Sequence, residues 1–84
     1  MTRTLDTHGE KRSLMTPIGI VEGDVLMYLE QHGRATLRML NRELAWPSYL
    51  VVMGVGALIR SGLVRATQLG LEIILQPRKP LLVQ

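Results

Sequence analysis

One stretch of the sequence constrains the fold more than any other, residues 47–64 with the sequence PSYLVVMGVGALIRSGLV. It has the length of a helix, opens at a proline, which suits the start of a helix, and reaches Gly62, which is able to end one. Between Tyr49 and Ile59 it contains no charged residue. A helix that is apolar on most of its circumference is normally covered by other parts of a protein. We therefore expect the rest of the chain, or a partner, to pack around it.

Size and composition argue against an enzyme. A chain of 84 residues forms one domain with a modest core and no cleft between domains. It contains no cysteine, which excludes disulfides, thiolate metal sites and thiol nucleophiles. His8 and His32 are 24 positions apart, a spacing that does not suit a metal site. We expect no catalytic residue, metal, cofactor or small-molecule substrate, because the acidic residues are also dispersed: Glu22, Asp24, Glu30, Glu43 and Glu72.

The charge balance is moderately basic. The formal net charge is +3 and the pI is about 10.0, which suits an acidic partner such as nucleic acid but is also common among small soluble proteins. The uncharged apolar run from Tyr49 to Ile59 is shorter than the roughly 20 residues that cross a bilayer. The start of the chain, MTRTLDTHGE, lacks the apolar region of a signal peptide. We expect a cytoplasmic protein without a membrane partner.

The amino-terminal part predicts a leader followed by a helix. Residues 1–15 mix polar and charged side chains without an apolar period, which indicates a flexible leader. Thr16 and Pro17 offer an N-cap and a proline at the first helical position. From Ile18 the apolar positions 18, 21, 25 and 29 recur at helical spacing as far as Gly33, which can take the left-handed conformation that closes a helix.

Two glycines lie inside this first helix. Gly19 and Gly23 each cost about 1 kcal/mol relative to alanine in a helix interior. They favour close approach of another backbone on their side of the helix. A helix that starts only near Glu22 is an equally good interpretation.

A second, shorter helix is expected over residues 37–44. Residues 34–36 leave room only for a very short extended segment, and Thr36 is a candidate N-cap. Ala45 and Trp46 then allow only a tight turn before the apolar stretch. The two helices around this turn form a helix-turn-helix candidate.

Two arginines of the second helix lie side by side. Arg38 and Arg42 are four positions apart, so a helix places both guanidinium groups on one accessible strip. This strip is either a solvated face, with Glu43 nearby, or a pair of phosphate contacts.

The third helix is expected to run from Pro47 to about Ser61. Pro47 suits its first position, and Ser48 is the alternative cap. Arg60 falls in the last turn, where the helix dipole favours a cation, and Gly62 ends the helix.

A β-hairpin is expected after the third helix. Residues 63–67 and 71–75 are rich in strand-forming side chains. Residues 68–70 form the connection, with Gly70 at the positive-φ position. Residues 77–84 contain two prolines that end regular structure, and close on a small apolar tail, LLVQ. This tail is exposed, pairs with an edge strand or docks on a partner.

The order helix, short strand, helix, turn, helix, hairpin is that of a winged helix-turn-helix domain, which we place at residues 16–76. The fold class is α+β, with three helices and a small antiparallel β wing. More narrowly, IGIVEGDVLMYLEQHG and VGALIRSGLV resemble a family of small stand-alone bacterial winged-helix domains of uncharacterised function. The matching positions are Ile18, Gly19, Gly23, Val25, Leu26, Gly33, Gly56, Leu58, Arg60 and Gly62.

The chain departs from this family at one position. The family often has a tryptophan directly after the glycine of the third helix, where this chain has Ala57, so the interior there is expected to be filled from elsewhere. The resemblance implies the fold and carries no catalytic residue.

The apolar third helix bears directly on function. Winged-helix proteins usually lay this helix in the major groove of DNA, where polar side chains identify base edges. With Val51, Val55 and Leu58 in the core, helical spacing places Val52 and Ile59 at the boundary. Four residues then face outward: Tyr49, Met53, Gly56 and Arg60. This outward face offers few donors or acceptors for base recognition.

The first hypothesis is a DNA-binding or transcription-related module that contacts mainly the phosphate backbone. The usual role of the fold puts it slightly ahead, although the wing tip at residues 68–70 has no basic residue. Its candidate contacts with nucleic acid are Arg34, Arg38, Arg42, Ser48, Tyr49, Arg60 and Arg65.

The second hypothesis is a protein-interaction or homodimerisation module without DNA binding. Glycine permits close approach of a partner, and methionine adapts its shape to an apolar surface. Its candidate interface residues are Tyr49, Val52, Met53 and Gly56.

Overall fold

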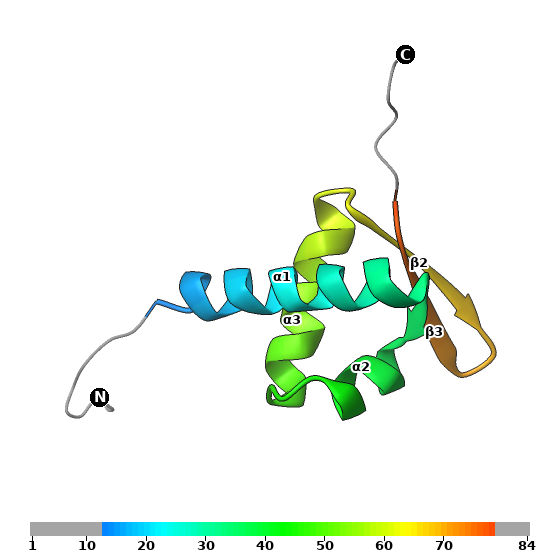
Figure 1. Ribbon diagram of the computed structural model, residues 1–84, viewed down its shortest axis with the longest axis horizontal. Coiled ribbons are helices and arrows are strands. Elements are labelled where there is room, and N and C mark those ends of the chain that lie inside the picture. Colours follow the sequence, from blue (N-terminus) through cyan, green and yellow to red (C-terminus); the bar gives the residue numbers. More distant parts are fainter. Residues whose placement is uncertain (1–12, 79–84) are drawn as a thin grey trace, which may run out of the picture.

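The computed structural model describes residues 13–78, which form three helices and one three-stranded antiparallel sheet. The predicted α+β class is therefore confirmed. Figure 1 shows α1 crossing α3, with α2 and the hairpin on one side of this crossing. The elements are α1 (Met15–His32), β1 (Ala35–Thr36), α2 (Leu37–Glu43), α3 (Ser48–Arg60), β2 (Val64–Leu69) and β3 (Glu72–Pro77). Most of the predicted leader (residues 1–12) and of the tail (79–84) lies outside the described residues.

Helix α1 begins earlier than predicted. Its first residue is Met15, and the Met15 N–H donates to Oγ of Ser13 at 3.1 Å. The predicted N-cap at Thr16 and the alternative start near Glu22 are both wrong. Pro17 is tolerated inside the first turn because the first N–H groups of a helix have no partner within it.

The end of α1 is as predicted. Gly33 has a φ of +83° and donates its N–H to the Leu29 carbonyl at 2.7 Å. Val21, Val25 and Leu29 are fully buried along one side of the helix.

The glycine at which two helices approach closely is in α3, not α1. An ideal Cβ on Gly19 or Gly23 meets no atom within 4 Å, so the predicted close approach at these positions is wrong. Both glycines lie outside the row of core positions in α1, on its exposed side. A Cβ on Gly54, by contrast, would lie 2.8 Å from Cγ1 of Val21. Gly54 thus lets α3 pack closely against α1.

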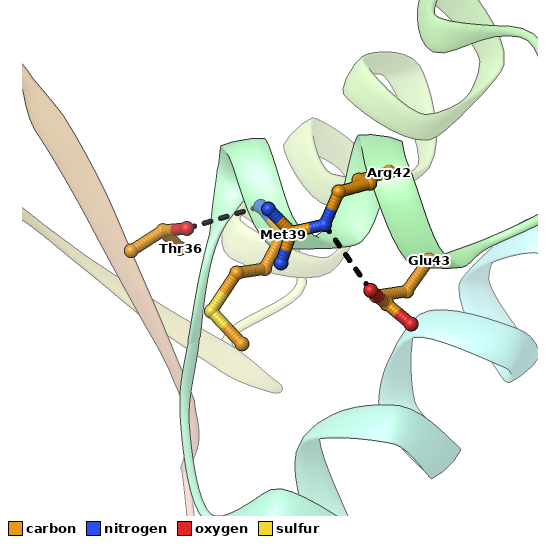
Figure 2. A network of polar contacts seen from close by, with 4 residues as sticks. All are labelled: Thr36, Met39, Arg42 and Glu43. Carbon is orange, nitrogen blue, oxygen red and sulfur yellow. Dashed lines mark hydrogen bonds and ion pairs between the residues drawn. The ribbon is translucent and has the colours of Figure 1, made fainter.

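The N-cap of α2 makes a side-chain hydrogen bond, whereas the N-cap of α3 makes none. Oγ1 of Thr36 accepts a hydrogen bond from the Met39 N–H at 3.0 Å, which confirms Thr36 as the N-cap of α2 (Figure 2). Pro47 is the N-cap of α3 and Ser48 its first helical residue. The helix thus begins one residue later than the predicted start at Pro47, and one residue earlier than the alternative cap at Ser48 implies. The carbonyl of Pro47 accepts from the N–H groups of Leu50 and Val51.

The sheet has the order β1-β3-β2, and both pairings are antiparallel. Leu69 pairs with Glu72, so the hairpin loop has two residues, Gly70 and Leu71, rather than the three predicted. Gly70 has a φ of +63° in the first position of the loop, which a two-residue turn of this kind requires. The shorter loop extends β2 and β3 beyond the predicted strand ends.

The core joins α1, α3 and the sheet. Trp46, in the turn between α2 and α3, packs against it, and its Nε1 donates to Oδ2 of Asp24 in α1 at 2.7 Å. The buried apolar residues are Val21, Val25, Leu29, Ala35, Leu40, Leu50, Val51, Val55, Leu58, Val64 and Leu75. Across residues 13–78 no helix combines the length and the apolar character needed to cross a membrane.

Candidate interaction surface

Helix α3 has one buried side and one exposed side. Val51, Val55 and Leu58 are buried as predicted, on the side where Gly54 meets α1. Tyr49 and Met53, predicted to face outward, are 64% and 38% exposed.

The exposed side extends beyond the predicted outward residues. Val52 and Ile59, predicted at the boundary, are 48% and 41% exposed. Gly56 is also exposed, and a Cβ at this position would meet no atom within 4 Å. We call this surface the outer face of α3, made of Tyr49, Val52, Met53, Gly56 and Ile59.

The outer face is apolar over most of its area. Its exposed fractions correspond to roughly 400 Å², a size typical of the largest apolar patch on a small protein and often functional there. Polar groups flank it at Ser48 and at Arg60, both exposed, and the Tyr49 hydroxyl adds one more. No carboxylate lies on α3.

The two arginines of α2 are accompanied by acidic partners. Arg38 Nη2 lies 2.8 Å from Glu72 Oε2 of β3. Figure 2 shows the second pair, in which Arg42 Nε lies 3.2 Å from Glu43 Oε2. The Arg38 and Arg42 side chains are 70% and 63% exposed. Exposed pairs of this kind are weak, so a phosphate could displace them. The positive charge that they offer is nonetheless partly compensated.

The other candidate arginines lie apart from the outer face. Arg65, in β2, lines a hollow with Glu30 and Arg78 beside the end of α1. Arg34 lines a different hollow with Met39 and β-strand residues. Both side chains are exposed and, within residues 13–78, neither has an ion-pair partner. The predicted nucleic-acid set is therefore spread over several elements, and only Ser48, Tyr49 and Arg60 belong to α3.

The wing tip is apolar. Leu69 is 66% exposed and Leu71 is 95% exposed on either side of Gly70. A wing that contacts DNA usually brings a basic side chain to phosphate or into the minor groove. Arg38, which lines a hollow with Leu71 of this tip, pairs with Glu72.

The described residues do not assemble a metal site. Among residues 13–78 no three histidine or acidic side chains come close enough to hold an ion. His32 is exposed at the end of α1, where its ring stacks on Tyr28 with centroids 4.0 Å apart.

Sequence reasoning missed two contacts that shape this surface. The Arg38–Glu72 pair and the contact of Gly54 with Val21 each join residues more than 30 positions apart. For Gly54 a signal existed, because Leu50, Gly54 and Leu58 follow one another at four-residue spacing on the core side of the apolar stretch.

Comparisons with protein-family models, with curated proteins and with solved structures found no match.

Proposed function

We propose that this chain is a winged helix-turn-helix domain that binds another protein through the outer face of α3. The order of the elements supports the fold, since α2 and α3 have the arrangement of a helix-turn-helix and β2 and β3 follow as a wing. The resemblance of residues 18–33 and 55–64 to small winged-helix domains supports it as well.

The composition of the outer face carries the functional part of the proposal. A helix that reads DNA presents arginine, lysine, asparagine, glutamine or serine to the base edges. The outer face presents Val52, Met53 and Ile59 instead, all more than a third exposed. Such a surface offers few donors or acceptors to a base edge. Contact with an apolar surface of another protein would instead remove its apolar side chains from water, which is favourable.

The size of that gain is substantial. Burial of roughly 400 Å² of apolar surface contributes on the order of 10 kcal/mol before the entropy cost of association is subtracted. Gly56 lets a partner backbone approach α3 closely, and Met53 adapts to the shape of the partner.

Photo-crosslinking tests the proposal directly. Benzoylphenylalanine in place of Val52 reports on the outer face, and the same residue in place of Met27 reports on an exposed apolar position of α1. In cells that contain the chain, we expect covalent protein adducts at position 52 several-fold above those at position 27. Equal yields at the two positions, or adducts with nucleic acid alone, would contradict a protein-binding role for the outer face.

A second candidate function is DNA binding through phosphate contacts. The net charge of +3 and the exposed Arg34, Arg60 and Arg65 favour it. Such binding would be largely independent of sequence and strongly weakened by salt.

A further inference from the structure

We infer that the outer face of α3 binds a second copy of this chain, with the two α3 helices antiparallel across a twofold axis. The inference rests on the proposed function and names the partner at the same surface. It follows from the charge of Arg60, beside one end of the outer face, and from the positions of four residues along α3: Tyr49, Met53, Gly56 and Arg60.

The outer face is complementary to itself when reversed. Consider a twofold axis perpendicular to α3 that passes beside the outer face, at the point along the helix midway between Gly54 and Val55. Met53 and Gly56 lie at equal distances on either side of this point, and in an antiparallel pair each Met53 therefore faces the partner's Gly56. Apart from the neighbouring backbone of α3, no atom of residues 13–78 lies within 4 Å of the Cβ position of Gly56, so the site is open to receive the methionine side chain. A surface that matches its own reversed copy is what a twofold interface requires.

The ends of the face match in the same register. Tyr49 and Arg60 also lie at equal distances from the midpoint. Their positions are 11 apart in the sequence, which is about three helical turns, so both lie along one stripe. An antiparallel pair brings each Arg60 to the Tyr49 ring of the other copy. A guanidinium group over an aromatic ring is a favourable contact. Tyr49 is 64% exposed and so is available for it.

Charge selects the antiparallel orientation over the parallel one. No acidic residue lies on α3 to compensate Arg60. In a parallel pair the two Arg60 side chains meet at the same end and repel each other. In the antiparallel pair they are about 16 Å apart along the helix axes, and each has an aromatic partner.

The buried interface area indicates how strongly the two copies associate. Two outer faces together bury roughly 800 Å², which is below the 1,200–2,000 Å² of standard stable interfaces. We therefore expect a dimer that dissociates on dilution, with a Kd on the order of 10 μM to 1 mM. This association is measurable by sedimentation equilibrium.

An NMR experiment identifies the register. Within one chain Tyr49 and Arg60 are about 16 Å apart along α3, beyond the reach of a nuclear Overhauser effect. A mixture of isotope-labelled and unlabelled chains should show such an effect between the Tyr49 ring and the Arg60 side chain of different copies. A dimer without this signal would overturn the antiparallel register.

Two matched glycine substitutions place the interface. Gly56→Glu puts a carboxylate in the centre of the outer face and Gly23→Glu puts one on the exposed side of α1. Both sites have open space, and the net charge of the two variants is the same. We expect Gly56→Glu to weaken dimerisation at least about tenfold and Gly23→Glu less than about twofold. Equal effects would overturn the inference.

The outcomes separate this inference from the function on which it rests. A chain that stays monomeric up to about 1 mM overturns the second copy as partner. Protein adducts at position 52 would then still support binding of a different protein. A dimer together with duplex DNA bound through the outer face would instead contradict the proposed function.

Discussion

At the scale of single residues, Gly54 is the position where side-chain size matters most. Gly54→Ala places a methyl group 2.8 Å from Cγ1 of Val21, a fully buried and β-branched residue with no room to move aside. Overpacking of this kind costs about 1–3 kcal/mol, while the better helix propensity of alanine returns about 1 kcal/mol at most. We expect the free energy of unfolding, measured in urea, to fall by about 1–2 kcal/mol.

The matched control is Gly23→Ala in α1, where an added Cβ meets open space. Alanine there gains helix propensity without a clash, so the free energy of unfolding should rise by about 0.5–1 kcal/mol. If the two variants change stability in the same direction, the close packing of α1 on α3 at Gly54 is not as described.

At the scale of elements, one hydrogen bond ties α1 to the turn between α2 and α3. Trp46 Nε1 donates to the Asp24 carboxylate at 2.7 Å in a partly buried setting. Trp46→Phe removes this donor, and hydrogen bonds to charged groups contribute about 1.5–3 kcal/mol. We expect a loss of that order in the free energy of unfolding.

A double-mutant cycle isolates this hydrogen bond from lost packing. In an Asp24→Ala background the acceptor is already gone, so Trp46→Phe should cost much less than in the original chain. An equal cost in both backgrounds would assign the effect to packing of the indole ring rather than to the hydrogen bond.

At the scale of the whole molecule, the distribution of charge argues against DNA binding through the outer face of α3. The exposed arginines lie on several elements, and two of them pair with carboxylates. We expect that random-sequence duplex at about 0.15 M salt leaves the amide signals of Val52, Met53 and Gly56 unshifted in a heteronuclear NMR titration, because phosphate contacts are strongly screened there.

The double variant Arg38→Glu, Arg42→Glu is the companion to this titration. Outer-face shifts on adding duplex that vanish in the double variant would support the DNA hypothesis instead. Signal shifts that occur only at low salt, and that decrease equally at every position as the salt concentration rises, fit a general attraction between a basic chain and a polyanion.

Much of the architecture was predictable from local patterns. Thr36, Gly33, Gly62 and Gly70 each carry a conformational signal that acts within a few residues, and each has the predicted role. The orientation of α3 followed from helical spacing, since a 3.6-residue period fixes which residues share a face.

The errors have physical causes of two kinds. The start of α1 is predicted two residues late, at Pro17 instead of Met15. Thr16-Pro17 has the residue types of a helix start, whereas the observed N-cap, Leu14, makes no side-chain hydrogen bond and carries no capping signal. The packing glycine and the Arg38–Glu72 pair depend on how α1 crosses α3 and on the register of β3. Which residues meet in such contacts is set by tertiary structure, even though the spacing of Leu50, Gly54 and Leu58 gives a local signal that Gly54 lies on the core side.

The position of β3 in the middle of the sheet has a consequence for the timing of folding. Both of its neighbours precede it in the chain, and its pairing with β1 joins Ala35 to Leu75, 40 residues apart. A nascent chain that has not yet reached Glu72 lacks the strand with which both β1 and β2 pair. Contacts over such a span carry a larger loop-closure cost than the local contacts of helices. Among the strands of residues 13–78, the last to be synthesised is thus the one that completes the sheet.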